Sequence, residues 1–450
     1  MKKLFGTDGI RGIANSEPIT AETAFKIGRA GAFHLKDKIN AKILIGRDTR
    51  ISGDMLESAL IAGICSVGVN VLRGGVLPTP AVAYLNRIYD VDCGIVISAS
   101  HNPYDNNGIK FIGKEGFKYS DEEEENIERI FFDNQLHKNL PKGKNIGCVE
   151  NIDNAQNKYI DFIKSTIPSY VNLNGIKIII DCANGALYKI APQVFSEMGA
   201  NIISMNDKPN GVNINLMCGA TNTSSLQKEV LKNAAKIGFA YDGDADRLIA
   251  VDEKGHIVDG DQIMAVCALN LLKKNKLTNN LVITTLMSNM GLDKAIEAAG
   301  GRVCRTKIGD RYVYEKMREK NAILGGEQSG HLIFLRHGTT GDGLLSSLQL
   351  LQVIIEEEKT LSDLADVIKK YPQILMNFKV KCKRSFFENV NITKMIKVSE
   401  EKLGGNGRVF IRASGTEPLI RVLLEGEEKE KIVSIAKRFK EVVEKENFNF

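Results

Sequence analysis

Residues 176–204, IKIIIDCANGALYKIAPQVFSEMGANIIS, contain the pattern that decides the fold. The apolar run 176–181 is followed by a predicted helix that ends at Gly199, and then by a second apolar run. Glycine is favoured where a left-handed residue ends a helix. Continuous apolar strands that alternate with helices are typical of parallel sheets covered on both faces. The stretch therefore predicts a strand–helix–strand unit of an α/β fold.

The same order of strand, helix, glycine and strand occurs twice more. The apolar runs 42–46 (KILIG) and 281–285 (LVITT) begin the other two units, whose predicted helices end at Gly68 and Gly300. A structural pattern that recurs along a chain indicates repeated modules. The sequence thus predicts three similar α/β domains.

The C-terminal part of the chain does not repeat this unit. Strands are predicted at 377–383, 408–412 and 419–424, and residues 427–446 place apolar side chains at helical spacing between charges. The fold class we expect is α/β, with three similar mixed α/β domains plus a smaller C-terminal α+β domain around a central cleft. The expected domains are 1–152, 153–252, 253–370 and 371–450.

The composition excludes several classes of protein. The 60 basic and 55 acidic residues leave a net charge of only +5 over 450 residues, which does not indicate a nucleic-acid partner. The 8 cysteines include no Cys-x-x-Cys pair, so we expect reduced thiols rather than zinc or redox motifs. The sequence contains no signal-peptide segment and no apolar run near the roughly 20 residues of a membrane span. We therefore expect a cytoplasmic protein with no membrane partner.

Residues 94–110, GIVISASHNPYDNNGIK, carry an apolar run into two serines and a histidine. A strand that ends before Ser98 and Ser100 would deliver their hydroxyls to the carboxyl edge of a sheet, where α/β folds bind ligands. The alternative is a plain turn rich in serine, asparagine and proline. No Gly-x-Ser-x-Gly elbow surrounds either serine, which argues against a serine hydrolase. The residues alone do not choose between the two serines.

Residues 239–251, FAYDGDADRLIAV, place three aspartates at alternate positions, Asp242, Asp244 and Asp246. Three neighbouring carboxylates repel one another unless a hard cation lies among them, and Mg²⁺ takes a few carboxylates together with a phosphate oxygen. An EF-hand loop is an alternative by spacing, but its sixth position requires glycine where this chain has Arg247. A purely structural acidic turn is a second alternative.

Residues 325–331, GGEQSGH, form a predicted tight loop between two apolar runs. Glu327, Ser329 and His331 offer acceptors and donors suited to sugar hydroxyls. A solvated turn explains the same residues equally well.

Residues 412–421, RASGTEPLIR, combine two arginines with a glycine-containing turn between predicted strands. Successive backbone N–H groups in such a turn form an anion nest, and guanidinium groups bind phosphate through paired hydrogen bonds. The loop therefore predicts a phosphate site. Together, the four loops indicate phosphoryl transfer on a phosphosugar, with one loop from each predicted domain facing a central cleft.

The motifs resemble those of the α-D-phosphohexomutases over essentially the whole chain. The matching segments are FGTDGIRG (5–12), SASHNP (98–103), DGDADR (242–247), GEQSGH (326–331) and RASGTEPLIRV (412–422). RTKIGDRYV (305–313) and TTGDGLL (339–345) are similar to the bacterial branch that acts on glucosamine phosphates. Each motif is common by itself, but the combination is specific.

The resemblance, and not the spacing, implies that Ser100 is the phosphorylated serine. It implies that Asp242, Asp244 and Asp246 hold Mg²⁺ together with an oxygen of the phosphoserine. The implied reaction interconverts glucosamine 6-phosphate and glucosamine 1-phosphate through a glucosamine 1,6-bisphosphate, which is both intermediate and activator.

Other catalytic residues are implied in the same way. Arg11 and Lys110 are expected near the transferring phosphoryl group. The general base is left open among Lys110 with a depressed pKa, His101 and His331. The residues expected to bind the substrate are Arg247, Glu327, Ser329, Arg412, Ser414, Gly415, Thr416 and Arg421.

Three alternatives to this function stay open on the sequence. A phosphomannomutase or phosphoglucomutase would perform the same chemistry on another hexose, and a phosphosugar phosphatase would let water intercept the phosphoserine. A Ca²⁺-binding or phosphosugar-sensing protein would not catalyse a reaction at all. The expected partner is a small phosphosugar, and the expected assembly is a monomer or homodimer.

Overall fold

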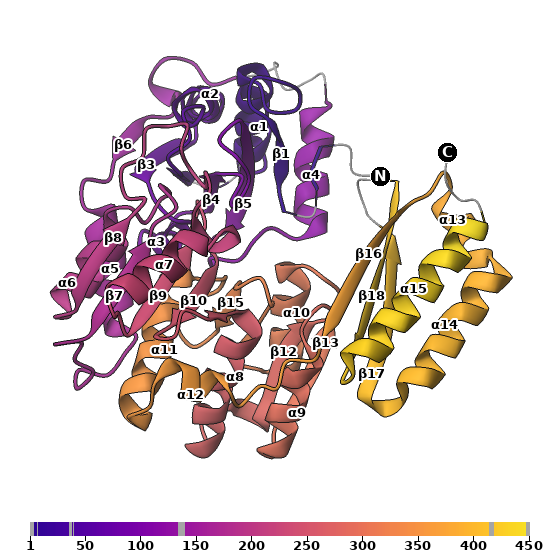
Figure 1. The fold of residues 1–450 in the computed structure, drawn as a ribbon. Helices are drawn as coiled ribbons and strands as arrows, with labels where there is room; N and C mark the ends of the chain where they lie inside the picture. The colour runs from indigo at the N-terminus through magenta and orange to yellow at the C-terminus, as the bar shows by residue number, and fades with distance from the viewer. Residues whose placement is uncertain are drawn as a thin grey trace. The chain divides into compact units, whose positions relative to one another are not determined.

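The chain forms two compact units in a computed structural model (Figure 1). The structure describes residues 4–6, 8–35, 38, 40–133, 140–413 and 418–446. The first unit consists of Met1–Thr285 and Cys304–Val367, and the second consists of Leu286–Val303 and Ile368–Phe450.

A six-stranded sheet in the order β1-β5-β4-β2-β3-β6 begins the first unit. Its strands are β1 (Ile10–Ile13), β2 (Lys42–Arg47), β3 (Asn70–Val76), β4 (Cys93–Ile97), β5 (Asn106–Gly113) and β6 (Val149–Asn151). The helices are α1 (Ala21–Phe33), α2 (Gly53–Cys65), α3 (Thr79–Ile88) and α4 (Asp121–Phe131). β2 is parallel to β3 and β4, whereas β5 runs antiparallel to β4 and β1. Because β2 and β4 are parallel neighbours, the polar loops that follow them begin at the same edge of the sheet.

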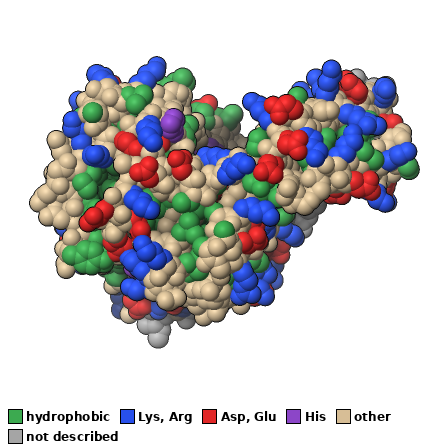
Figure 2. Space-filling view, turned by 60° about the horizontal axis from the view of Figure 1, so that its bottom comes forward, with side chains coloured by type: hydrophobic (Ala, Val, Ile, Leu, Met, Phe, Trp, Pro, Cys, Tyr) green, Lys and Arg blue, Asp and Glu red, His purple; other side chains and the backbone are tan. Residues whose placement is uncertain are grey.

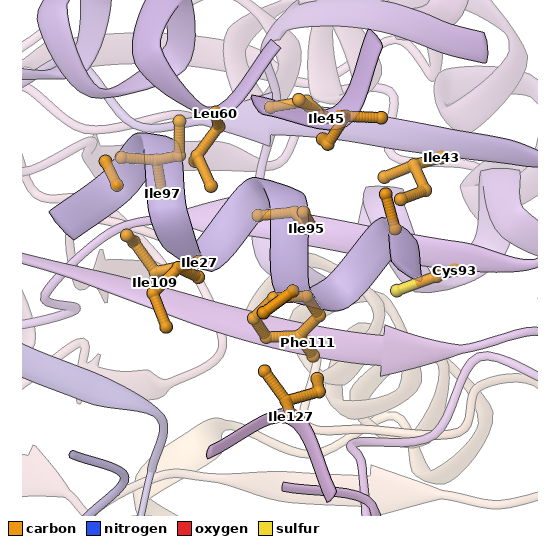
Figure 3. Close-up of a cluster of buried hydrophobic side chains, with 14 of the residues drawn as sticks. Ile27, Ile43, Ile45, Leu60, Cys93, Ile95, Ile97, Ile109, Phe111 and Ile127 are labelled. Atoms are coloured by element: carbon orange, nitrogen blue, oxygen red, sulfur yellow. The ribbon is translucent and has the colours of Figure 1, made fainter. Parts of the chain in front are cut away.

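Branched and aromatic side chains, which favour strands, build the core of this sheet. Ile43 and Ile45 share one face of β2 because side chains alternate along a strand. They lie in one buried cluster with Ile95 of β4 and Phe111 of β5, and Ile27 of α1 joins them from the covering helix (Figure 3). The core therefore holds β4 and its following loop against a rigid layer.

Helices α1 and α2 cross closely because glycines lie where they meet. A Cβ atom on Gly63 would lie 2.1 Å from the carbonyl oxygen of Phe25. A Cβ atom on Gly28 would lie 2.5 Å from the carbonyl oxygen of Leu60. Neither position has room for a larger residue, so this close crossing depends on glycine.

The second sheet has five strands in the order β11-β10-β9-β7-β8. Its strands are β7 (Lys177–Asp181), β8 (Asn201–Met205), β9 (Ile237–Tyr241), β10 (Leu248–Asp252) and β11 (Ile257–Val258). The accompanying helices are α5 (Ala155–Ser165), α6 (Ile190–Glu197) and α7 (Ser224–Lys232). β7 is parallel to β8 and β9, as the strand–helix–strand pattern predicts, and β10 returns antiparallel beside β9. The β9–β10 hairpin carries the acidic loop 242–247 at its tip.

The third sheet has the order β13-β12-β14-β15. Its strands are β12 (Leu281–Thr285), β13 (Arg302–Thr306), β14 (Leu324–Gly326) and β15 (Leu332–Phe334). The helices here are α8 (Gly260–Lys273), α10 (Asp310–Lys320), α11 (Gly343–Glu357) and α12 (Leu361–Ala365). The short 3₁₀ helices of the described chain are not confined to this sheet; they are η1 (Gly143–Asn145), η2 (Gly219–Thr221), η3 (Thr278–Asn280) and η4 (Gly404–Asn406). The β14–β15 hairpin carries the predicted sugar loop 327–331.

The second unit contains an antiparallel sheet in the order β16-β18-β17. Its elements are α9 (Met290–Ala298), β16 (Gln373–Lys379), α13 (Lys383–Glu388), α14 (Val390–Leu403), β17 (Gly407–Ala413), β18 (Leu419–Gly426) and α15 (Lys429–Lys445). Helices α14 and α15 pack along one face of the sheet (Figure 1). The predicted mixture of strands with an amphipathic closing helix is confirmed here.

The strand predicted at 377–383 is wrong in position, because β16 spans Gln373–Lys379. The alternation of inward and outward side chains along β16 begins earlier than predicted. Ile374, Met376 and Phe378 pack against the core, while Leu375 is 48% exposed. α13 then begins at Lys383, so the last predicted strand residues lead into a helix. Helices α13 and α14 were not predicted from the sequence.

Charged side chains of both signs are interspersed on the face shown in Figure 2. This mixture matches the small net charge of +5. In the described part of the chain, no helix has both the length and the apolar composition of a membrane span.

Candidate functional site

Ser100 lies in the loop after β4, and its hydroxyl reaches the acidic loop of the second sheet. The side chain is buried, and its Oγ donates a hydrogen bond of 2.6 Å to Oδ2 of Asp242. Nδ1 of His101 lies 3.3 Å from the same Oγ. The backbone at Ser100 has φ of 52°, a left-handed conformation that is uncommon for a residue with a side chain. The loop therefore directs one hydroxyl to a buried cluster of carboxylates.

Ser98 has a different environment. Its Oγ donates to Oδ2 of Asp48 at 2.6 Å and accepts the backbone N–H of Ser100 at 2.9 Å. Ser98 is fully buried. These two hydrogen bonds use the O–H donor of its hydroxyl and one of the two acceptor positions on its oxygen. This geometry favours Ser100 as the reactive hydroxyl, a choice that the residues alone left open.

The aspartates of the acidic loop converge on one space. Asp242, Asp244 and Asp246 are buried, and each offers a carboxylate oxygen within 4.8 Å of the others. The Oδ1 atoms of Asp244 and Asp246 have no hydrogen-bond partner among the described residues. No other group of three or more His, Cys, Asp or Glu side chains converges in this way in the parts of the chain described. Buried carboxylate oxygens without partners are the ligands that a hard divalent cation takes, so these residues fit a metal ion.

The surroundings of the acidic loop exclude the EF-hand alternative. An EF-hand loop connects two helices. Here the loop connects β9 to β10, which pair in antiparallel register through Tyr241 and Leu248. The carboxylates are therefore held at the tip of a β-hairpin.

Asp242 and Asp244 have pKa values shifted in opposite directions. Burial, together with the carboxylates of Asp246 and Asp244, holds the pKa of Asp242 well above its usual range. Burial alone would also raise the pKa of Asp244, but the Lys110 ammonium and the hydrogen bonds from Lys110 and Thr79 hold that pKa below its usual value. Thr79 donates to Oδ2 of Asp244 at 2.7 Å. A cation near Asp242 would favour its charged form.

Lys110 extends from β5 into the same cluster and is 2% exposed. Its Nζ donates to Asp244 at 2.8 Å, and it lies 3.3 Å from Asp8 and 3.9 Å from Asp246. Burial lowers the pKa of Lys110, but the carboxylates of Asp244, Asp8 and Asp246 outweigh burial, so the pKa is raised. The expectation that Lys110 has a depressed pKa is therefore wrong for this arrangement, because three acids surround the ammonium group.

Arg11 and Arg247 add two further cations. The Arg11 guanidinium pairs with the carboxylate of Asp8, and its Nε donates to the carbonyl of Asp8 at 3.3 Å. Nε of Arg247 lies 3.7 Å from Asp246. Burial opposes the charge of Arg247, but Asp246 and Asp242 outweigh burial and raise its pKa. Arg247 thus lies beside the acidic loop, and Arg11 shares the carboxylate of Asp8 with Lys110.

His331 lies beside this cluster, at the end of the predicted sugar loop. Its Nε2 is 3.4 Å from Asp310 and 3.9 Å from Asp246. Neither ring nitrogen has a hydrogen-bond partner among the described residues, although the side chain is buried. His101, by contrast, has its pKa lowered to about 4 by burial and by the positive charges of Arg247 and Arg11. The imidazole of His101 is therefore neutral at pH 7 and accepts a proton less readily than an ordinary histidine.

Glu327 and Ser329 lie together in the turn between β14 and β15. Oε1 of Glu327 accepts the backbone N–H of Gly309 at 3.1 Å. Ser329 is exposed, and its Oγ donates to Oε2 of Glu327 at 3.3 Å. The loop offers one carboxylate and one hydroxyl, which suits hydrogen bonds to a sugar.

In the second unit, Arg412 and Arg421 are paired residues on β17 and β18. Burial and the positive charge of Arg421 lower the pKa of Arg412. Two adjacent guanidinium groups of this kind favour an anion between them. Ser414, Gly415 and Thr416 lie outside the described residues.

The sequence analysis missed several residues that hold this site together. Asp8 is part of the quoted motif FGTDGIRG, and its carboxylate pairs with Arg11, Lys110 and Lys118. Asp310 is part of the quoted RTKIGDRYV and pairs with Lys118. Asp8 and Asp310 both lie within motifs that resemble the family, and this position is the signal that could have identified them. The polar loop after β2, which provides Asp48, could have been found as a second loop at the same sheet edge.

Comparisons with known proteins give a consistent result along the chain. Family models match residues 2–138 as phosphoglucomutase/phosphomannomutase alpha/beta/alpha domain I, 157–255 as domain II, 259–371 as domain III and 350–442 as the C-terminal domain. A protein of Desulforamulus reducens named phosphoglucosamine mutase is 52% identical over 444 residues, covering 98% of this chain and 99% of that one. The protein of the same name from Clostridioides difficile is 52% identical over 439 residues, covering 97% of each.

Solved structures are similar in fold. A phosphoglucomutase/phosphomannomutase family protein from Burkholderia thailandensis has a TM-score of 0.80 at 24% identity and covers 98% of this chain and 96% of its own. An Aspergillus fumigatus N-acetylphosphoglucosamine mutase, solved with GlcNAc-6P and magnesium, has a TM-score of 0.70 at 16% identity and covers 98% of this chain and 95% of its own.

Proposed function

Because the chain belongs to the phosphoglucomutase/phosphomannomutase family, we propose that it interconverts glucosamine 6-phosphate and glucosamine 1-phosphate. This is the phosphoglucosamine mutase activity in the names of its bacterial relatives. The observation that carries the proposal is the 2.6 Å hydrogen bond from the buried Ser100 hydroxyl to Asp242. The enzyme would be an isomerase of the intramolecular phosphotransferase class, supplying UDP-N-acetylglucosamine and cell-wall precursor synthesis.

In the proposed reaction, phosphorylated Ser100 transfers its phosphoryl group to O1 of glucosamine 6-phosphate. The P–O bond to the serine breaks as the bond to O1 forms, which gives glucosamine 1,6-bisphosphate and a serine hydroxyl. The bisphosphate reorients, and Ser100 takes the phosphoryl group from O6. Such transfer requires positioning and charge stabilisation, with little covalent chemistry for the protein to perform. The buried position of Ser100 supports this by limiting access of water.

Asp242, Asp244 and Asp246 would hold Mg²⁺ together with an oxygen of the phosphorylated Ser100. Their buried, convergent carboxylates support this assignment. When bound, Mg²⁺ supplies positive charge that stabilises the phosphoryl oxygens and the departing serine oxygen.

Lys110, Arg11 and Arg247 would balance the charge that develops on the phosphoryl oxygens. The carboxylates of Asp8, Asp244 and Asp246 keep these groups positive and hold them beside the acidic loop. The mechanism therefore uses positive side chains placed before the substrate arrives.

The general base is proposed among His101, His331 and Lys110. His101 lies 3.3 Å from the Ser100 hydroxyl, a distance that would allow proton transfer at this end of the reaction. His331 has ring nitrogens without partners among the described residues and lies on the side of the sugar loop. The raised pKa of Lys110 keeps its amine protonated, which disfavours Lys110 as a base.

The sugar would hydrogen-bond to Glu327 and Ser329, and the sugar phosphate that does not react would bind the arginine pair of the second unit. The residues proposed for that phosphate are Arg412, Ser414, Gly415, Thr416 and Arg421. We expect the protein to act in the cytoplasm as a monomer or homodimer on a small phosphosugar. The division into domains 1–152, 153–252, 253–370 and 371–450, one for each loop, is part of the same proposal.

The test combines two measurements on purified protein. Intact mass should find a fraction heavier by one phosphoryl group, and that mass should be absent from Ser100→Ala. Parallel assays with the 6-phosphates of glucosamine, glucose and mannose should give the highest kcat/KM for glucosamine. A preference for glucose or mannose would contradict the proposed substrate. Release of inorganic phosphate equal to turnover would instead favour a phosphatase.

A further inference from the structure

The backbone of the Ser100 loop is organised around one buried arginine from the loop after β2. Arg50 is 1% exposed, and its side chain is directed at backbone carbonyls. One terminal nitrogen donates to the carbonyls of Ser100 at 2.9 Å and Asn102 at 2.8 Å. The other donates to the carbonyls of Asn106, at 2.9 Å, and Pro103. Four carbonyls of a single loop thus accept from one side chain.

The fifth N–H of this guanidinium fixes Arg50 itself. Its Nε donates to Oδ2 of Asp48 at 2.9 Å, and the same carboxylate accepts the hydroxyl of Ser98. A guanidinium has five N–H donors in a rigid plane, and each of them has a partner here. Arg50 is therefore fully used and leaves no donor for a substrate.

The left-handed backbone at Ser100 needs such support. A residue with a side chain in this conformation costs free energy, and it persists where the surrounding contacts determine it. Nδ2 of Asn215 adds hydrogen bonds to the carbonyls of Ser100, at 2.8 Å, and Asn102, at 3.0 Å. Arg50 and Asn215 bind the same two carbonyls, so together they fix the conformation that points the Ser100 hydroxyl at Asp242.

We propose that Arg50 is a positioning residue for phosphoryl transfer: it holds the 100–106 backbone so that the Ser100 oxygen keeps its place at the acidic loop. This proposal rests on the proposed function, because it assumes that Ser100 carries the phosphoryl group. Lysine cannot replace Arg50, because an ammonium group has three donors at one point and cannot reach four carbonyls and Asp48 together. A small displacement of a reacting group is enough to slow transfer by orders of magnitude.

The experiment compares Arg50→Lys with wild type and with Arg73→Lys. Arg73 of β3 is the control, since it pairs with the buried Glu57 of α2, and the hydrogen bond and ion pair described for its side chain do not involve the Ser100 loop. We expect Arg50→Lys to lower kcat by at least about tenfold while KM changes by less than about threefold. Dephosphorylated enzyme mixed with glucosamine 1,6-bisphosphate should also gain the phosphoserine mass correspondingly more slowly. A general loss of stability would reduce the active fraction without slowing this step in the folded molecules.

The possible outcomes distinguish failure of the positioning role of Arg50 from failure of the proposed function. If folded Arg50→Lys gains phosphoserine at the wild-type rate, the positioning role is wrong. If wild type itself gains no phosphoserine from the bisphosphate, the proposed function fails instead. If Arg50→Lys does not fold, Asn215→Ala takes its place: a kcat lower by at least about threefold with unchanged KM supports the proposal, and an unchanged kcat overturns it.

Discussion

Ser98 and Ser100 have the same hydroxyl group, yet their surroundings give them different chemistry. Ser98 donates to Asp48 and accepts from the backbone, so its oxygen is part of the loop's own hydrogen bonds. Ser100 donates to Asp242 and lies beside His101, so its oxygen faces groups that can change charge. At the scale of single residues, contacts distinguish the two hydroxyls where residue type does not.

Replacing each serine with alanine separates these roles. Ser100→Ala should lose the phosphoserine mass and lower kcat by at least about 10³-fold, because the variant lacks the hydroxyl that carries the phosphoryl group in the proposed reaction. Ser98→Ala should keep the phosphoserine mass and instead lower the free energy of unfolding by about 1–3 kcal/mol, since it removes one hydrogen bond to the buried Asp48 carboxylate and the acceptor for the backbone N–H of Ser100. Intact mass and urea denaturation provide the two readouts. A phosphoserine that persists in Ser100→Ala would contradict the assignment.

Asp244→Asn tests the metal site. The substitution removes one negative charge from the three-carboxylate cluster, so affinity for Mg²⁺ should fall by at least about tenfold when measured by calorimetry. Asp252→Asn is a matched control, because Asp252 is buried at the far end of the same hairpin and bonds to the backbone of Lys254 and His256. Equal Mg²⁺ affinity in the two variants would remove Asp244 from the metal site.

At the scale of elements, the chain positions its loops by strand direction and helix packing. β2 and β4 are parallel neighbours, which brings Asp48 and Ser98 to the same edge although they are far apart in sequence. The antiparallel pair β9 and β10 projects the aspartates from a hairpin tip. Strand apolarity and helix-ending glycines predicted most of these elements, whereas β16 was misplaced because its inward residues start at Ile374.

Gly63→Ala tests the close crossing of α1 and α2. A Cβ at this position would lie 2.1 Å from the carbonyl oxygen of Phe25, so the helices must move apart. We expect the free energy of unfolding to fall by about 1–3 kcal/mol. Gly405→Ala should have little effect, because a Cβ there has no neighbour within 4 Å. Chemical denaturation measures the free energy of unfolding of both variants. Equal values would show that α1 and α2 accommodate the added Cβ atom without loss of stability.

For the whole molecule, the proposed reaction uses groups from both units. Ser100, the acidic loop and the sugar loop belong to the first unit, and the arginine pair belongs to the second. The proposed substrate has two ends with different needs, since its O1 hydroxyl reacts with the phosphoryl group of Ser100 and its 6-phosphate only binds. A central cleft remains a prediction of the sequence analysis.

Arg421→Ala should weaken binding of the non-reacting phosphate. Loss of a charged hydrogen bond costs about 1.5–3 kcal/mol, which corresponds to a KM increase of roughly 10- to 150-fold. The phosphoserine mass should persist, because Ser100 and its surroundings are unchanged. Arg438→Ala, at an exposed arginine of α15 in the same unit, is the control. Steady-state kinetics with glucosamine 6-phosphate measure the effect, and an unaltered KM would remove Arg421 from the phosphate site.

The sequence by itself determined the α/β class, the three repeated units and the residue types of the site, because apolar periodicity, glycine positions and motif chemistry are local properties. Only the tertiary structure decided which serine donates its hydrogen bond to Asp48. It also decided which carboxylates raise the pKa of Lys110, and which carbonyls of the Ser100 loop accept hydrogen bonds from Arg50. These outcomes depend on contacts between residues from about fifty to more than a hundred positions apart. Their burial, and therefore their electrostatics, arises only when the sheets bring their loops together.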